Sequence, residues 1–204
     1  MDTLTKLSIF LTSPRKPRFV SHLFLFMLPP SSEGEVLDKA YELWRGGKAH
    51  KVCFVDTGPG SGALGASHWK NLLMKRGMPE DHILPVPYTF PEGHINTLYE
   101  AISFAKFIQA ESLTTVGILC QAFHLLRAAM TLVSVLKELR IQISLHPYTS
   151  EVCYWHDVMV HSQGSVKGSR LDLVDSELER IRRYQEKGDI GLEDEILNYL
   201  TNTF

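Results

Sequence analysis

The chain is poor in cysteine and shows no cysteine motif. Its 204 residues contain three cysteines, Cys53, Cys120 and Cys153, which are odd in number and far apart. Without a CxxC pair or a Cys/His cluster, the sequence supports neither a disulfide framework nor a zinc finger, and we predict no metal site. Cys53 and Cys120 lie in apolar runs and are expected to be buried. This use of cysteine favours a reducing, cytoplasmic location.

The sequence also lacks an excess of one charge. Lysine and arginine number 21 against 23 aspartates and glutamates, which gives a formal net charge of -2. A balance of this kind does not create the positive field of a dedicated nucleic-acid-binding protein, so we expect no nucleic-acid partner. The composition, with 44% hydrophobic and 22% charged residues, is typical of a soluble globular protein.

Long hydrophobic runs are missing as well. The longest apolar stretch near the start runs from Phe19 to Leu28 and is interrupted by Ser21 and His22. It is too short to cross a bilayer as a helix, so we expect no membrane span. Pro29 and Pro30 follow it in place of a small-residue cleavage site, and we interpret the stretch as a buried strand rather than a targeting segment.

The chain instead alternates short apolar runs with longer amphipathic ones. The pattern predicts helices over residues 35–45, 66–76, 96–110, 123–139 and 171–187, and strands over 23–28, 51–56, 83–87, 114–120 and 141–145. Strands that alternate with helices indicate βαβ units and a mostly parallel sheet covered on both faces, so the predicted fold class is α/β. The prolines around residues 83–87 place that strand near a sheet edge.

The predicted organisation has three parts. Residues 1–18 form an N-terminal extension, residues 19–150 the α/β core, and residues 151–204 a C-terminal loop and helical extension that packs on the core. Residues 153–169 show no firm period and are interpreted as a loop. The helix over 171–187 is expected to pack through its apolar positions, which are Leu171, Val174, Leu178, Ile181 and Tyr184.

Ligands of open α/β sheets bind beyond the carboxyl ends of the strands. That rule selects four loops here, which are residues 29–33, 56–65, 90–97 and 121–127. The second loop contains a GxGxxG pattern at residues 60–65, displaced from its strand by Asp56, Thr57, Gly58 and Pro59. It fits an anion-binding turn with amides near Gly58 and Gly60, a dinucleotide site, or a plain surface loop. Asp56 could contact a ribose hydroxyl, orient a histidine or bind a cation.

The fourth loop carries the sharpest signal. His124 and Arg127 lie near the start of the predicted helix that follows Gln121. Because they are three residues apart, they share one face of that helix. A guanidinium there can hold a phosphate or carboxylate, and a histidine can move a proton. The alternative is that Arg127 pairs with a structural acid and His124 caps the turn. Asn96 and Thr97 also begin a helix, where an asparagine N-cap is the ordinary explanation.

The order of these motifs resembles the YdcF-like family, which also includes the SanA and ElyC envelope proteins. The resemblance covers residues 23–148 and rests on VCFVDTGPG, on the Asn96-Thr97 pair and on the HLLRA run from His124 to Ala128. It implies a Rossmann-like three-layer α/β/α sandwich of about five strands, in which Asn96, Thr97, His124 and Arg127 line a pocket. One soluble branch of the family is associated with S-adenosylmethionine, and membrane-anchored branches with cell-envelope maintenance.

The chain departs from the family pattern at three places. Leu28-Pro29-Pro30 stands where the family has a glycine-rich turn, His94 replaces a serine that precedes the Asn-Thr pair, and Tyr99-Glu100 replaces a Glu-Asn that follows it. These departures leave open how the first strand contributes to a site.

We therefore expect a soluble YdcF-like protein that binds a nucleotide-like or other anionic small molecule, with S-adenosylmethionine as a candidate cofactor. The reaction, the oligomeric state and whether the chain is an enzyme stay open; no GxSxG nucleophile elbow is present. His124 is the candidate catalytic residue, and the candidate ligand-binding residues are Asp56, Thr57, Gly58, Gly60, Asn96, Thr97, Gln121 and Arg127. On this reading, Arg127→Ala abolishes binding with little loss of stability. The alternatives are a non-catalytic interaction module with a degenerate pocket and an NAD(P)-dependent oxidoreductase.

Overall fold

The computed structural model of the chain describes residues 2–12, 18–26, 28–60, 62–88, 90, 95–150, 154–161 and 166–202. The elements of the core are β1 (Val20–Leu25), α2 (Glu33–Arg45), β2 (Ala49–Val55), α3 (Ala66–Lys75), the short 3-10 helix η1 (Glu80–His82), β3 (Ile83–Val86), α4 (Thr97–Ala110), β4 (Thr115–Cys120), α5 (Ala122–Glu138) and β5 (Ser144–Thr149). Outside the core lie α1 (Thr3–Thr12), β6 (Val158–His161), β7 (Val166–Ser169), α6 (Arg170–Glu186) and α7 (Glu193–Asn202).

The central sheet has five parallel strands in the order β3-β2-β1-β4-β5. Phe24 of β1 lies opposite Cys53 on one side and Ile118 on the other. This architecture confirms the predicted Rossmann-like α/β fold with a mostly parallel sheet. The chain runs outward from β1 to β3 and then crosses back to β4, so the direction of winding switches between β1 and β4. In open α/β sheets, the carboxyl edge at such a switch point is where ligands bind.

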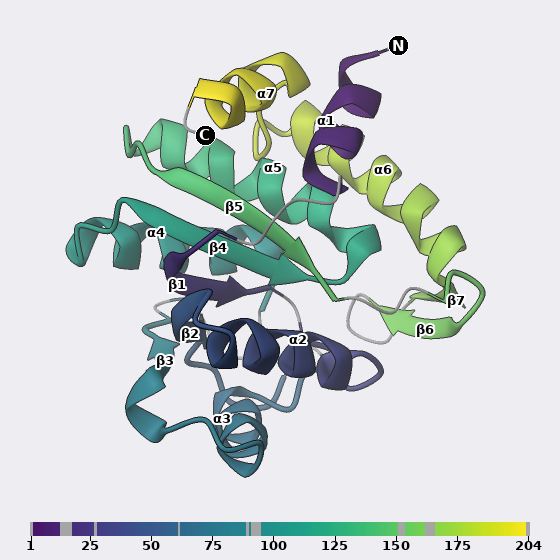
Figure 1. The fold of residues 1–204 in the computed structure, drawn as a ribbon. Helices are drawn as coiled ribbons and strands as arrows, with labels where there is room; N and C mark the ends of the chain where they lie inside the picture. The colour runs from purple at the N-terminus through teal and green to yellow at the C-terminus, as the bar shows by residue number, and fades with distance from the viewer. Residues whose placement is uncertain are drawn as a thin grey trace.

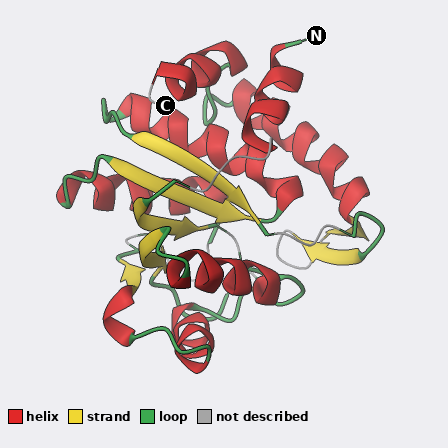
Figure 2. Ribbon diagram, viewed as in Figure 1, coloured by secondary structure: helices red, strands yellow, loops and turns green. Residues whose placement is uncertain are grey.

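Helices cover both faces of this sheet (Figure 1; Figure 2). Leu23 and Leu25 of β1 pack in one apolar cluster with α2 and α3, whereas Phe24 and Phe26 pack in the other cluster with α4 and α5. Successive side chains of a strand point to opposite faces, so one continuous apolar run fills both layers of the core. The buried strands therefore hold the loops at the carboxyl edge in fixed positions.

Prolines mark the two edges of the sheet. The prediction that residues 83–87 form an edge strand is confirmed, because β3 is the outermost strand on its side. The prediction that the last core strand spans 141–145 is wrong at both ends, since β5 covers Ser144–Thr149 and contains Pro147. A proline usually ends a strand, but an outermost strand can accommodate one on its unpaired side.

Within the predicted N-terminal extension, Thr3–Thr12 form helix α1. Its Leu7 and Leu11 are buried in the same apolar cluster as α5 and β5. The hydroxyl of Thr3 donates to Asp194 Oδ1 of α7 at 2.8 Å, which joins the two ends of the chain over α5 (Figure 1). Residues 3–12 thus pack on the core.

The C-terminal part differs from its prediction in two ways. The interpretation of residues 153–169 as a loop is wrong for 158–161 and 166–169, which pair as the antiparallel hairpin β6-β7. The predicted face of α6 is confirmed at Val174, Leu178, Ile181 and Tyr184, which pack against the apolar clusters, but it is wrong at Leu171, which is 55% exposed. The same face also buries Arg170 and Glu177, whose charges a search for apolar spacing does not find.

Candidate functional site

Three helices begin at the carboxyl edge, after the neighbouring strands β1, β2 and β4. The N-cap residues of α2, α3 and α5 are Ser32, Gly65 and Gln121, and none of them forms a side-chain cap with another described residue. By contrast, Asn96 Oδ1 caps α4 by accepting from the Tyr99 amide at 2.9 Å. The helix dipole gives the amino end of a helix a partial positive charge, and first-turn amides add to it where no backbone carbonyl accepts from them. We call these three amino ends the edge helix ends.

Four polar side-chain atoms at the same edge have no hydrogen-bond partner within the described part of the chain. They follow four different strands and are Ser32 Oγ after β1, Thr57 Oγ1 after β2, Gln121 Oε1 after β4 and Ser150 Oγ after β5. We call them the edge atoms. Ser32, Gln121 and Ser150 are almost entirely buried. A buried polar atom left unpaired costs about 1–3 kcal/mol, so four of them at one edge point to a bound partner such as water or a ligand.

The contacts of the Gln121 side-chain amide show that the edge lacks a hydrogen-bond donor for its oxygen among the described residues. Its Nε2 donates to the Ser32 carbonyl oxygen at 3.2 Å and to Glu35 Oε2 at 3.3 Å. Gln121 Oε1 is therefore the atom that requires a donor, and a serine hydroxyl can either donate or accept. A partner with both an anionic group and a hydroxyl or N–H would satisfy the edge helix ends and the edge atoms together.

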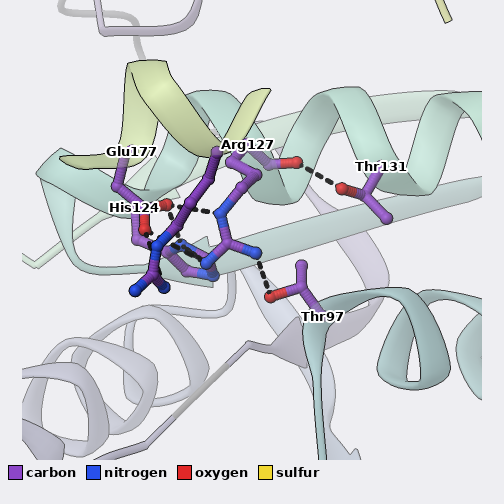
Figure 3. A network of polar contacts seen from close by, with 6 residues as sticks. Thr97, His124, Arg127, Thr131 and Glu177 are labelled. Atoms are coloured by element: carbon purple, nitrogen blue, oxygen red, sulfur yellow. Dashed lines mark hydrogen bonds and ion pairs between the residues drawn. The ribbon is translucent and has the colours of Figure 1, made fainter. Parts of the chain in front are cut away.

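A second polar cluster joins α4, α5 and α6 (Figure 3). Arg127 donates from Nε to Glu177 Oε2 at 2.7 Å and from Nη2 to Glu177 Oε1 at 3.1 Å, which is a bidentate ion pair. Its Nη1 donates to Thr97 Oγ1 at 2.7 Å. Arg127, Glu177, Thr97 and His124 are all buried. The cluster thus binds the start of α4 to α5 and α6 inside the protein.

The same carboxylate orients His124. His124 Nδ1 lies 2.8 Å from Glu177 Oε2 and 3.2 Å from Arg127 Nη2. An ionised carboxylate can only accept and a guanidinium can only donate, so the shorter contact assigns the proton to Nδ1, donated to Glu177. In that tautomer Nε2 is the basic atom of the ring, the arrangement by which a buried carboxylate prepares a histidine to accept a proton.

These contacts bear on both interpretations of the helix start. Arg127 pairs with an acid, as the structural alternative expects, but the His124 side chain contacts Glu177 instead of capping the turn. Asp56 was a candidate to orient a histidine, and the acid that contacts His124 is Glu177 from α6. The role of His124, Thr97 and Arg127 in ligand binding stays a prediction.

A cavity of about 70 Å³ adjoins Arg127, and its lining includes Asn96, Thr97, Tyr184 and Asp189. Three of the predicted site residues therefore share one hollow. Pockets for whole small molecules measure about 300–1,000 Å³, whereas one water occupies about 30 Å³ of liquid. This cavity can hold water or one carboxylate or phosphate group, but not a nucleotide.

A larger hollow of about 530 Å³ lies at the other end of the sheet, between the end of α5 and α7. It is lined by Lys137, Arg140 and Tyr199, among others, and the ammonium group of Lys137 pairs with Glu195 in a largely exposed ion pair. It is wide open and lies away from the carboxyl edge, so size alone does not identify the site.

The glycine-rich segment forms a compact turn between β2 and α3. Gly60 and Ala63 exchange two backbone hydrogen bonds, at 3.1 and 2.8 Å, so the Gly60 amide is used within the turn. The Ala66 amide donates to the Thr57 carbonyl oxygen at 2.8 Å. Of the predicted residues here, Thr57 contributes an edge atom and Gly58 and Gly60 shape the turn. Ser61, within the GxGxxG pattern, lies outside the described residues.

The segment that begins with Pro29 and Pro30, where the chain departs from the family pattern, forms a tight turn. The Pro29 carbonyl oxygen accepts from the amides of Ser32 and Glu33, both at 2.9 Å, so the turn leads directly into α2. The Glu33 carboxylate accepts from the Trp69 indole at 3.1 Å and contacts His68 at 2.8 Å, which fixes α2 against α3. The turn brings Ser32 to the switch point. His94 and Cys153 lie outside the described residues.

Some site residues have a weak local signal in the sequence or none. Glu177 and Arg170 lie on the buried face of α6, and only their spacing of seven residues relates them in the sequence. Ser32 and Ser150 look like ordinary loop serines in the sequence, and only the folded sheet shows that they are buried at one edge. Cys53 and Cys120 are buried as predicted, and burial raises the pKa of both thiols, so neither supplies a thiolate at neutral pH.

Two searches of the described ranges bear on broad function. No helix there is both long and apolar enough to cross a membrane. Nor do three or more His, Cys, Asp or Glu side chains gather there in a way that could hold a metal ion. Comparison of the chain with family models, curated proteins and solved structures finds no match. The fold and the geometry of the carboxyl edge therefore carry the functional argument.

Proposed function

We propose that this chain binds a nucleotide-like or other phosphate- or carboxylate-bearing small molecule at the carboxyl edge of β2, β1 and β4. The observation that carries the proposal is the coincidence of the edge helix ends with the edge atoms. Ser32 and Gln121 are the N-cap residues of two of those helices, and their side chains contribute two edge atoms.

Physical chemistry supports an anion at this place. Helix amino ends offer N–H groups and a partial positive charge, and together these make a ready site for phosphate or carboxylate. A polar ligand would also form hydrogen bonds with the edge atoms and so remove the free-energy cost of leaving them unpaired. The edge lies at the switch point of the sheet, where doubly wound folds bind their ligands.

S-adenosylmethionine is the first ligand to test, because the family resemblance implies it; ATP, NAD and a sugar nucleotide complete the set. S-adenosylmethionine binding would not establish methyl transfer, which also needs an acceptor site. If a bound ligand turns over, His124 held by Glu177 is the proposed proton acceptor, and His124→Ala is expected to abolish turnover. NAD stays in the set as the test of the oxidoreductase alternative.

The experiment is calorimetric titration of the wild type and three serine variants with these four ligands. Ser32→Ala and Ser150→Ala each delete an edge atom. Each is expected to lower the affinity for the ligand about tenfold, the effect of losing one or two hydrogen bonds. Ser103→Ala is the matched control, because Ser103 of α4 also carries a buried hydroxyl without a partner in the described chain. Its affinity should equal that of the wild type.

The stability of the same variants provides a second measurement. Ser32 makes no side-chain cap to a described residue, so Ser32→Ala should change the free energy of unfolding without ligand by no more than about 0.5 kcal/mol. The absence of binding by every ligand, or equal weakening by all three alanine variants, would contradict the proposed site.

The second candidate function is a non-catalytic interaction module. The closed Arg127–Glu177 pair favours it, since an internal carboxylate already occupies the guanidinium that an anionic ligand would otherwise use. Turnover of any small molecule that His124→Ala abolishes would exclude this candidate. Failure of all ligands to bind a well-folded wild type would favour it.

A further inference from the structure

Arg170 brings a buried cation to the carboxyl edge from a distant part of the sequence. It is the first residue of α6, directly after β7, and its side chain is 2% exposed. Its Nη2 donates to Glu35 Oε1 at the start of α2 and contacts Met159 Sδ of β6 at 3.6 Å. The hairpin and α6 thus hold a guanidinium over the edge.

One carboxylate connects Arg170 to the edge atoms. Glu35 accepts from Arg170 at Oε1 and from Gln121 Nε2 at Oε2, and the same Gln121 Nε2 contacts the Ser32 carbonyl oxygen. Arg170 therefore lies beside the amino ends of α2 and α5, where the edge atoms of Ser32 and Gln121 are found. Positive charge from one side chain and two helix ends converges on the position of the Glu35 carboxylate.

The two partners of this ion pair are not equally fixed. The Arg170 side chain is buried, whereas the Glu35 side chain is 32% exposed. Glu35 can rotate into water and be solvated there, but Arg170 cannot leave without exposing its packed surroundings. An incoming anion that replaces Glu35 keeps a negatively charged partner beside the buried Arg170 guanidinium.

We infer that Arg170 is the ligand-binding cation of the edge site, and that Glu35 is an internal occupant which the phosphate group of the ligand displaces. The inference rests on the proposed function and names its ligand class as a phosphate ester. A phosphate can accept from the guanidinium in a bidentate manner and from helix amides at once. A hydroxyl on the same ligand supplies the donor that Gln121 Oε1 requires.

The test uses opposite effects from the two ends of one ion pair. Arg170→Gln and Glu35→Gln both break the pair, so a purely structural role would give the two variants similar behaviour. We expect Arg170→Gln to weaken the binding of adenosine 5′-monophosphate and of inorganic phosphate about tenfold, and Glu35→Gln to strengthen both by a similar factor. Adenosine, which lacks the phosphate, should bind both variants alike.

The matched control is Arg76→Gln. Arg76, the C-cap residue of α3, pairs with Asp38 of α2 at 2.6 Å, so this variant also breaks an Arg–acid contact to α2, but in an exposed pair. Its phosphate affinity should equal that of the wild type. Titrations are carried out in a buffer without phosphate, at constant ionic strength.

The outcomes separate this inference from the proposed function. If a ligand binds and Ser32→Ala weakens it while Arg170→Gln and Glu35→Gln leave it unchanged or weaken it alike, the assignment of Arg170 is overturned and the edge site remains. If Arg170→Gln does not fold, the test rests on Glu35→Gln. Phosphate binding by Glu35→Gln that is no tighter than that of the wild type then overturns the assignment. If no ligand, phosphate included, binds any folded variant, the proposed function itself fails.

Discussion

Replacement of Glu177 by alanine is expected to lower the free energy of unfolding by about 3–5 kcal/mol, because it leaves Arg127 as a buried charge without its bidentate partner. The same carboxylate contacts His124 at 2.8 Å and lies 3.7 Å from Arg180, so its loss affects three basic side chains. Urea unfolding followed by circular dichroism measures the change.

Glu195→Ala is the control for this experiment. Glu195 accepts from Lys137 at 2.6 Å in a largely exposed ion pair, and pairs of that kind contribute about 0–1 kcal/mol. A loss below about 1 kcal/mol for Glu177→Ala would contradict the account of the cluster. The double variant Arg127→Met with Glu177→Leu should be more stable than Glu177→Ala, since apolar side chains leave no buried charge.

The ion pair also changes the meaning of a substitution at Arg127. The sequence alone led us to expect that Arg127→Ala removes binding with little loss of stability. Because Arg127 is buried and paired with Glu177 and Thr97, its removal is expected to destabilise the fold as well. Loss of ligand binding in that variant would therefore not locate the site, and the serine variants are the sharper test.

Gly65→Ala is expected to destabilise the protein by about 3 kcal/mol, the combined effect of a strained backbone and overpacking. Gly65 has a φ of 86°, which L side chains rarely adopt, and a Cβ would lie 2.7 Å from the Gly58 carbonyl carbon and 2.8 Å from the Thr57 oxygen. Those are backbone atoms of the turn before α3, so they cannot move aside as the end of a side chain can. Thermal and urea unfolding measure the loss.

Gly58→Ala provides the comparison within the same turn. A Cβ at Gly58 would meet nothing within 4 Å, and we expect its stability to stay within about 0.5 kcal/mol of the wild type. Equal stability of the two variants would show that the close approach of Gly65 to Thr57 does not hold the turn in solution. If the turn also positions the amino end of α3 for a ligand, Gly65→Ala weakens binding and Gly58→Ala does not.

The parts of the fold that follow from local pattern were predictable from the sequence. The apolar runs that became β1, β2 and β4 and the helices between them produced the α/β class and the edge position of β3. Local pattern also placed Asn96, Thr97 and Gln121 at helix starts, where α4 and α5 begin, and Arg127 near the start of α5, where it lies in the second turn. Each of these features depends on residues close together in the chain.

The partners of those residues were not predictable in the same way. Arg127 and Glu177 are 50 residues apart in the sequence, and Arg170 and Glu35 are 135 residues apart. Which acid meets which base depends on how α6 crosses the finished sheet, and periodicity within α6 cannot show it. The hairpin β6-β7 was not predicted because its strands are short. In β6, exposed Val158 and Val160 are as apolar as buried Met159, so no alternation of polar and apolar residues marks the strand.

The central claim is that a phosphate- or carboxylate-bearing small molecule binds at the amino ends of α2, α3 and α5. The most direct measurement is the change in backbone amide chemical shifts of the ¹⁵N-labelled wild type on addition of S-adenosylmethionine, ATP, NAD, a sugar nucleotide and adenosine 5′-monophosphate. The account predicts saturable shifts for at least one of them, largest in the first turns of these helices at residues 33–35, 66–68 and 122–124. Saturable shifts confined to other parts of the fold, or none with any of these ligands, would contradict it.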